Sequence, residues 1–140
     1  MLDVPFKTYS KEGPMDDIAE YHRTHASSSA KAEFKSAAVF GLGYIGLPTA
    51  ALIASRGIHV LGIDVNEDVV RKISSGAVHI YEPDLDGLVQ KVISTGALKV
   101  SMQPEPSDAF IIAVPTPISA EKAPVLDSVF TAVRAIAPLL

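Results

Sequence analysis

The chain has 140 residues, of which 48% are apolar, so it has the length of about one domain and enough hydrophobic residues for a core. Its formal net charge of −4 argues against nucleic acid as a main partner, and the absence of cysteine excludes disulfides, thiolate metal sites and a cysteine nucleophile from this stretch. No apolar run reaches the ~18–20 residues that span a membrane and no signal-peptide pattern is present, which predicts a cytoplasmic protein without a membrane partner.

Residues 1–35 are more polar than the rest and predict a mobile N-terminal arm. Within the arm, residues 16–23 could form a short helix capped by Asp16 or Asp17. His22 and His25 could share a face of that helix, which suggests a metal site. Because no third ligand is in view, solvated histidines are the simpler interpretation. Residues 36–140 form the predicted folded domain.

From Ser36 onward, short apolar runs alternate with helical patterns. The predicted strands cover residues 37–40, 60–63, 98–101 and 109–114, and the second is apolar enough to be buried on both faces. The predicted helices cover residues 45–56, 66–75, 84–95 and 127–137; glycines 57, 76 and 96 end the first three, and Asn66, Asp84 and Asp127 are the expected N-caps. The alternation predicts an α/β fold with a Rossmann-like, doubly wound parallel sheet that is incomplete at its C-terminus.

The glycine pattern between the first strand and the first helix is the most informative motif. Gly41 allows a sharp turn out of the strand, Gly43 leaves room for a pyrophosphate beside the backbone, and Gly46 lets the helix lie close to the sheet. The free N–H groups and the positive dipole end of the helix would then face the phosphates. The alternative is a glycine-rich helix start with only a packing role.

Asp64 follows the second strand, about 20 residues after the glycine turn, where a carboxylate can accept hydrogen bonds from both hydroxyls of a ribose. An acid at this position repels a 2′-phosphate, so the pattern favours NAD over NADP. A simple turn residue after a strand is the alternative, but it leaves the preceding glycine turn without an explanation.

Two further segments have candidate roles. Residues 114–117, Val-Pro-Thr-Pro, follow the fourth strand at the edge of the sheet where ligands bind, so Thr116 could donate a hydrogen bond to the cofactor. The alternative is an exit loop stiffened by proline.

Residues 79–85 form a long connection between two helices, in which His79 or Glu82 could take part in acid–base chemistry. A loop that caps the next helix is the favoured interpretation.

Four segments together resemble the UDP-glucose/GDP-mannose dehydrogenase family. They read Gly-Leu-Gly-Tyr-Ile-Gly-Leu-Pro (41–48), Gly-Ile-Asp-Val-Asn (62–66), Tyr-Glu-Pro-Asp-Leu (81–85) and Ala-Val-Pro-Thr-Pro (113–117). The resemblance covers residues 36–140. The third and fourth segments are most similar to the branch that oxidises UDP-N-acetyl-D-mannosamine.

The resemblance implies a homo-oligomeric enzyme that oxidises the C6 alcohol of a UDP-sugar to a carboxylate in two steps, with two NAD molecules, for polysaccharide precursors. It assigns cofactor contacts to Gly41, Gly43, Tyr44, Ile45, Gly46, Asp64 and Thr116, with Tyr44 and Ile45 acting through their backbone N–H groups. The family's catalytic cysteine and lysine would follow Leu140, so we expect this stretch alone to be inactive. UDP-glucose or GDP-mannose as the substrate, and a non-catalytic NAD-binding fragment, are the alternatives.

Overall fold

The computed structural model describes residues 34–140. The predicted arm, its helix over 16–23 and the pair His22 and His25 lie outside the described residues, apart from the arm's last two positions, Phe34 and Lys35. Within the described part, no helix is long and apolar enough to cross a membrane.

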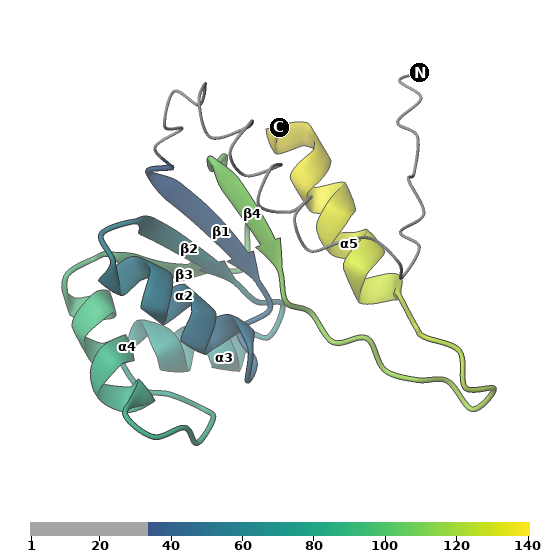
Figure 1. Ribbon diagram of the computed structural model, residues 1–140, viewed down its shortest axis with the longest axis horizontal. Helices are drawn as coiled ribbons and strands as arrows, with labels where there is room; N and C mark the ends of the chain where they lie inside the picture. Colours follow the sequence, from purple (N-terminus) through teal and green to yellow (C-terminus); the bar gives the residue numbers. More distant parts are fainter. Residues whose placement is uncertain (1–33) are drawn as a thin grey trace, which may run out of the picture. The chain divides into compact units, whose positions relative to one another are not determined.

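Four parallel strands form one sheet in the described domain. The strands are β1 (Ser36–Phe40), β2 (His59–Ile63), β3 (Leu98–Ser101) and β4 (Ala109–Ile112), and their order across the sheet is β3-β2-β1-β4 (Figure 1). β1 therefore lies between β2 and β4. The strand order reverses direction beside β1, and in doubly wound sheets ligands bind outside the carboxyl ends of the strands at such a point. The predicted fold class is confirmed.

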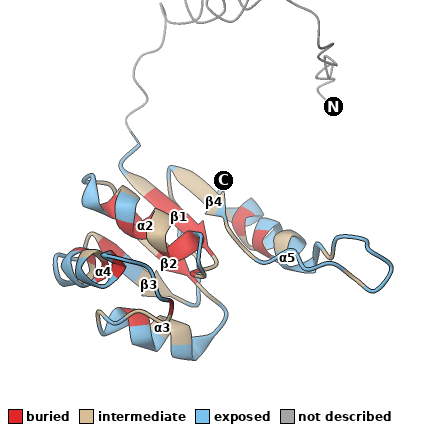
Figure 2. Cartoon of the chain, turned by 60° about the horizontal axis from the view of Figure 1, so that its bottom comes forward, coloured by how far each residue is buried: buried red, intermediate tan, exposed pale blue. Residues whose placement is uncertain are grey.

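Helices cover both faces of the sheet, but unequally. α2 (Gly46–Ser55), α3 (Glu67–Ser74) and α4 (Leu85–Ser94) lie on one face. Of the helices in residues 34–140, only α5 (Asp127–Ile136), which continues into the 3₁₀ turn η1 (Ala137–Leu139), lies on the other face (Figure 1). The buried residues therefore concentrate in β1, β2 and the inward sides of these helices (Figure 2).

Alternation along β1 supplies both halves of the core. Val39 is fully buried among residues of α2, α3 and α4, whereas Ala38 and Phe40 point to the α5 face. On that face the ring of Phe40 lies 6.5 Å from the ring of Phe110 in β4. A strand that is buried on both faces in this way must lie in the centre of its sheet, as the apolar sequence of β1 predicts.

The helix ends confirm some of the predicted caps and correct others. Asn66 caps α3, because its side-chain oxygen accepts hydrogen bonds from the N–H groups of Asp68 at 3.0 Å and Val69 at 3.4 Å. The prediction for Asp84 is wrong. Asp84 precedes α4 in the left-handed conformation, with φ at 63°, and its side chain makes no capping bond. Residues that cap a helix usually have extended backbone, which directs the side chain at the first free N–H groups.

The predicted cap at Asp127 is also wrong. α5 begins at Asp127 itself, and the preceding residue, Leu126, has no side chain that could cap it. The carboxylate of Asp127 lies in the first turn, where the helix dipole still favours a negative charge. The residue therefore contributes to the helix start through the dipole and makes no capping hydrogen bond.

Two predicted strands differ from the observed ones. The fourth strand was expected over 109–114, but β4 ends at Ile112, with one further ladder bond from Ala113 N–H to the Phe40 carbonyl at 2.8 Å. The ladder stops there because β1, its partner, turns away at Gly41. β2 was expected to be buried on both faces, but Leu61 is only half-buried, because α5 is the one helix of the described domain that packs on that face.

Asp108 joins the amino ends of β1 and β4. One of its carboxylate oxygens accepts hydrogen bonds from the backbone N–H groups of Lys35 and Ser36, both at 2.9 Å, and from the Ser36 hydroxyl at 3.0 Å. These bonds, led by that from Lys35, hold the pKa of Asp108 below its ordinary value. A carboxyl whose pKa is lower in the folded state contributes stability above its unfolded pKa of about 3.9 and loses it as the pH falls.

Replacing Asp108 by asparagine removes the charged acceptor, so Asp108→Asn should lower the melting temperature near neutral pH. The difference from the parent should persist down to about pH 5 and shrink as the pH falls below about 4, and it should vanish once the pH is below the lowered pKa at which the folded carboxyl is protonated. Thermal unfolding of the full chain followed by circular dichroism at a series of pH values measures this. Glu82→Gln is the matched control, because that exposed side chain accepts no hydrogen bond within residues 34–140. A difference for Asp108→Asn that does not vary with pH would contradict the assignment.

Candidate functional site

The glycine turn begins where β1 ends. Gly41 has φ at +87°, a conformation that side chains with a Cβ rarely adopt. A Cβ at this position would also lie 2.7 Å from the carbonyl oxygen of Ala113, the residue that follows β4. A glycine is therefore needed at position 41 for two reasons: the positive φ of the turn and the close approach of Ala113 at the end of β4.

Gly46, the first residue of α2, is the tightest point of the site. A Cβ on Gly46 would overlap the carbonyl oxygen of Gly41 and reach the Ala113 side chain at 3.4 Å. The helix can start this close to the end of β1 only because nothing projects from its first residue. The predicted packing role of Gly46 is therefore confirmed.

Gly43 has the opposite environment, because no atom lies within 4 Å of the position that its Cβ would occupy. The backbone is open to solvent at this point. The N–H groups of Gly41 and Leu42 donate to residues at the end of β2. Within residues 34–140, the next three N–H groups, those of Gly43, Tyr44 and Ile45, donate no hydrogen bond. Three free N–H donors beside an open glycine, at the start of a helix, are the features that bind an anionic diphosphate.

Asp64 lies directly after β2 and is connected to the glycine turn. Its Oδ2 accepts a hydrogen bond from the Leu42 N–H at 2.9 Å, and its Oδ1 accepts one from the Asn66 N–H at 2.9 Å. Because each carboxylate oxygen can accept two bonds, both oxygens retain acceptor capacity for hydroxyl groups of a ligand. The structure thus brings Asp64 and the glycine turn together, across 22 residues of sequence.

A second contact supports the same junction and was not predicted from the sequence. The Leu42 side chain is fully buried, and a Cβ on Gly62 of β2 would lie 2.9 Å from one of its methyl carbons. The absence of a side chain at Gly62 therefore leaves space for Leu42 beneath the turn. The sequence signal was a glycine inside an apolar strand, which often indicates close packing of another group.

Thr116 lies in an exposed loop and is not held against the turn. The loop connects β4 to α5 and extends away from the sheet (Figure 1). It is closed on itself by an isolated bridge between Ile118 and Pro124. Ala113, three residues before Thr116, lies beside Gly41, whereas no hydrogen bond joins Thr116 to the turn within residues 34–140. Its predicted contact stays a prediction.

Within residues 34–140, no hydrogen bond joins the loop between α3 and α4 to the glycine turn. Tyr81 and Glu82 are exposed, and Ile80 is buried in the core. The Nδ1 atom of His79 is buried without a hydrogen-bond partner among the described residues. The acid–base roles considered for His79 and Glu82 therefore gain no support from the geometry. Nor does any group of three or more His, Cys, Asp or Glu side chains in residues 34–140 lie where it could hold a metal ion.

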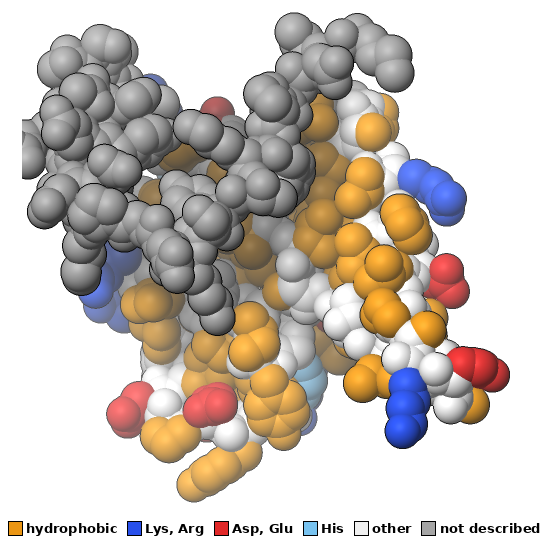
Figure 3. Space-filling model, turned by 45° about the vertical axis from the view of Figure 1, so that its right-hand side comes forward, with side chains coloured by type: hydrophobic (Ala, Val, Ile, Leu, Met, Phe, Trp, Pro, Cys, Tyr) orange, Lys and Arg blue, Asp and Glu red, His pale blue; other side chains and the backbone are white. Residues whose placement is uncertain are grey.

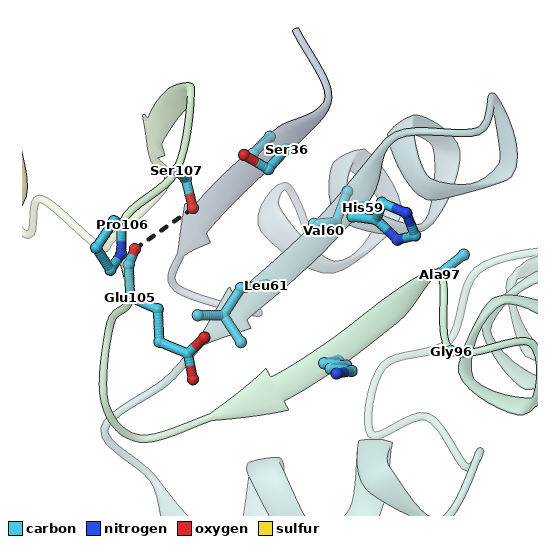
Figure 4. Close-up of a pocket in the computed structure, with 11 residues that line it drawn as sticks. Ser36, His59, Val60, Leu61, Gly96, Ala97, Glu105, Pro106 and Ser107 are labelled. Carbon is cyan, nitrogen blue, oxygen red and sulfur yellow. Dashed lines mark hydrogen bonds between the residues drawn. The ribbon is translucent and has the colours of Figure 1, made fainter.

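A cavity of about 190 Å³ lies at the other end of the strands (Figure 4). Ser36 and His59 at the amino ends of β1 and β2 line it, together with Glu105 and Ser107 from the loop before β4. Among the labelled side chains, the marked interaction is a 3.4 Å bond from the Ser107 hydroxyl to the Glu105 carbonyl (Figure 4). Because ligands of such sheets bind at the carboxyl ends, the glycine turn and Asp64 remain the candidate site.

Comparison with known proteins identifies relatives of this domain. Residues 35–140 match the model of the UDP-glucose/GDP-mannose dehydrogenase family, NAD binding domain. The chain is 52% identical to an NDP-N-acetyl-D-galactosaminuronic acid dehydrogenase of Ralstonia nicotianae over 108 residues. This alignment covers 77% of this chain and 26% of the relative. It is 51% identical to the UDP-N-acetyl-D-mannosamine dehydrogenase of Campylobacter jejuni over 109 residues, and this alignment covers 77% of this chain and 27% of that relative.

Solved structures give the same result. The UDP-N-acetyl-mannosamine dehydrogenase of Staphylococcus aureus superposes with a TM-score of 0.73 at 44% identity, over 75% of this chain and 26% of that one. The GDP-mannose dehydrogenase of Pseudomonas aeruginosa superposes with a TM-score of 0.69 at 33% identity, over 71% of this chain and 24% of that one. The chain therefore spans about a quarter of the length of the relatives that it matches.

Three glycine-to-alanine variants should separate folding from cofactor binding. Gly46→Ala should destabilise the domain by about 1–3 kcal/mol or more, because its methyl group overlaps the Gly41 carbonyl. Gly43→Ala should fold normally but bind NAD at least about tenfold more weakly, because its methyl group fills the open space over the turn. Gly87→Ala, at an exposed position of α4 where no atom lies within 4 Å of the new methyl group, should leave binding unchanged and add about 0.4–1 kcal/mol of stability.

Urea unfolding and calorimetric titration with NAD give the two readouts. The interpretation of the turn fails if Gly43→Ala binds NAD as tightly as the parent, or if Gly46→Ala is as stable as the Gly87→Ala control.

Proposed function

The chain belongs to the UDP-glucose/GDP-mannose dehydrogenase family, and from that membership we propose that its glycine turn and Asp64 hold the NAD of a nucleotide-sugar dehydrogenase. Residues 35–140 match the family's NAD-binding domain, so NAD is the cofactor. The proposal concerns the residues that hold it and the reaction of the whole protein.

The observation that carries the proposal is the position of three different features at one edge of the sheet. Gly43 leaves open space, the turn presents three free N–H groups, and Asp64 lies within hydrogen-bond distance of Leu42 in the same turn. In our proposal the N–H groups of Gly43, Tyr44 and Ile45 bind the pyrophosphate, and the dipole of α2 adds a favourable charge. The exposed side chains of Tyr44 and Ile45 are not needed for this role.

The Asp64 carboxylate would accept hydrogen bonds from the two hydroxyls of the adenosine ribose. The bonds from Leu42 and Asn66 fix both oxygens, so the acceptors are in place before the ligand arrives. The same negative charge opposes a 2′-phosphate, which supports the predicted preference for NAD over NADP. Thr116, on the loop after β4, would donate its hydroxyl toward the nicotinamide side.

NAD supplies the hydride acceptor for oxidation of an alcohol. The described residues bind and orient the cofactor, and none of them is proposed to transfer a proton to or from the sugar. The whole protein would oxidise the C6 alcohol of a nucleotide-linked sugar to a carboxylate. We propose UDP-N-acetyl-D-mannosamine as that sugar nucleotide, because relatives at 51% and 44% identity carry this name.

Three alternatives stand beside this proposal. The most similar relative cited above, at 52% identity, is named for an N-acetylgalactosaminuronic acid, so an N-acetylated amino sugar is the feature that both substrate names share. UDP-glucose or GDP-mannose is less favoured, because the GDP-mannose enzyme is only 33% identical over the aligned part. A non-catalytic domain that binds NAD is the third possibility.

Asp64→Asn should weaken NAD binding about 10- to 100-fold, because a charge-assisted hydrogen bond contributes about 1.5–3 kcal/mol. Asp64→Ala should weaken it further, since it also removes the acceptors for Leu42 and Asn66. Glu67→Gln is the matched control: this exposed acid starts α3, three residues further on, and should bind NAD like the parent. Calorimetric titration of each full chain provides the comparison. Unchanged binding by both Asp64 variants would remove this residue from the site.

The proposed substrate is tested with the whole protein, expressed from its native gene. With NAD present, formation of NADH should be faster with UDP-N-acetyl-D-mannosamine than with UDP-glucose or GDP-mannose. A higher rate with UDP-glucose would replace the proposed sugar, and NAD binding without any turnover would support the non-catalytic alternative.

A further inference from the structure

Gly62 occupies the interior of β2, where a glycine is unfavourable. It pairs with Val39 of β1 on one side and with Val100 of β3 on the other. Glycine weakens a strand, because it loses more conformational freedom on folding than other residues and has no side chain to pack. The backbone does not require a glycine here, since φ at Gly62 lies outside the positive region. The reason for this glycine must therefore be the space that it leaves.

Two neighbouring side chains fill that space. A Cβ at position 62 would lie 2.9 Å and 3.1 Å from the two methyl carbons of Leu42, and 3.1 Å from one methyl carbon of Val100. Carbon atoms in good contact lie about 3.5–4.0 Å apart. A methyl group on residue 62 would therefore displace the Leu42 side chain most, and the Val100 side chain less.

Leu42 is the buried anchor of the glycine turn. Many apolar side chains of the domain lie at its surface (Figure 3), and the nearby side chains of Tyr44 and Ile45 are 64% and 73% exposed. The Leu42 side chain, in contrast, is fully buried in the same cluster as Val39 and Leu47. Because protein interiors are close-packed, this side chain has little room to move alone. A displacement of it would be transmitted to its own backbone.

The backbone of Leu42 holds the Asp64 carboxylate. Its N–H donates to Oδ2 of Asp64 at 2.9 Å, and the Asn66 N–H donates to Oδ1 at 2.9 Å. Gly62 and Asp64 are two residues apart at the end of β2, so Leu42 contacts the same strand end twice. Its side chain lies on Gly62, and its N–H fixes one oxygen of Asp64. The orientation of the carboxylate therefore depends on how closely the Leu42 side chain approaches β2.

We propose that Gly62 is a positioning residue for the ribose site, an inference that rests on the proposed function above. By leaving room for Leu42, Gly62 sets the distance between the Leu42 N–H and Asp64. A larger residue at position 62 would raise Leu42 from the strand and lengthen its bond to Oδ2. The carboxylate would then keep only the bond from Asn66 and would turn away from the ribose hydroxyls. Gly62 acts through Leu42 and Asp64, from beneath the turn.

A double-mutant cycle with Asp64 tests the proposal by calorimetric titration of the full chain with NAD. Gly62→Ala should weaken NAD binding about threefold or more. In an Asp64→Ala background the same change should have no further effect, because no carboxylate is left to misplace. Gly87→Ala is the matched control, at an exposed position of α4 with no atom within 4 Å of its added methyl group, and should bind NAD like the parent.

Equal weakening by Gly62→Ala in both backgrounds would overturn the proposal, because it would indicate a general disturbance of the fold. Full affinity of Gly62→Ala for NAD would overturn it too. Failure of the proposed function gives a different result. Asp64→Ala itself would then bind NAD like the parent, and the positioning role would be lost together with the ribose site.

Second substitutions identify the neighbour through which Gly62 acts. Gly62→Ala/Leu42→Val shortens the side chain on the turn by one carbon and should restore most of the lost affinity for NAD. Gly62→Ala/Val100→Ala removes the other close contact and should restore none. Restoration by the Val100 substitution alone would overturn the proposal, because it would attribute the effect to β3. Urea unfolding and far-ultraviolet circular dichroism check that each variant is folded.

Nuclear magnetic resonance of the free chain gives a readout that does not need NAD. The amide signals of Leu42 and Asn66 report on the two donors to Asp64, and both should shift in Gly62→Ala but not in Gly87→Ala. The Asn66 signal is decisive, because this N–H bonds to the carboxylate oxygen that Leu42 does not contact. An Asn66 signal that stays in place would overturn the proposal, whatever the effect on NAD binding.

Discussion

The start of α2 lies directly against the end of β1, and the rest of the site depends on that contact. No Cβ fits between Gly46 and the Gly41 carbonyl, so the helix begins directly beside the end of the strand. The N–H groups of Gly43, Tyr44 and Ile45, at this helix start, donate no hydrogen bond within residues 34–140. A longer loop would give those donors other partners. In the proposed site, the N–H groups that bind the diphosphate are therefore a consequence of how closely two elements are joined.

Asp64 extends the site to the second strand. Its carboxylate connects the turn to the end of β2 through Leu42, while the Leu42 side chain fills the space above Gly62. The same carboxylate thus stabilises the turn and, in the proposed site, presents acceptors to a ribose. Under that proposal cofactor binding and local stability use one group, and a substitution at Asp64 affects both. Glu67 serves as the comparison for Asp64, because it is also an acid near the end of β2 but no hydrogen bond joins it to the turn in the described domain.

Patterns that depend on neighbouring residues were predictable from the sequence. The glycine turn, the order of elements and the Asn66 cap all follow from local spacing, and the structure confirms them. The predictions for Asp84 and Asp127 were wrong because a cap depends on backbone conformation, which composition does not reveal. The end of β4 depends on where β1 turns, and the packing of Leu42 on Gly62 joins distant segments. Such contacts are set by tertiary structure, beyond the reach of a single sequence without known relatives.

The central claim is that a dinucleotide lies on the glycine turn with its ribose at Asp64, at the carboxyl edge of the sheet. Residue-resolved nuclear magnetic resonance of the full chain during titration with NAD tests this most directly. The account predicts that the amide signals of Gly43, Tyr44 and Ile45 shift most, together with those of Asp64 and its neighbours. Shifts centred on Ser36 and His59, around the cavity at the amino ends of the strands, would contradict it, as would a spectrum that NAD leaves unchanged.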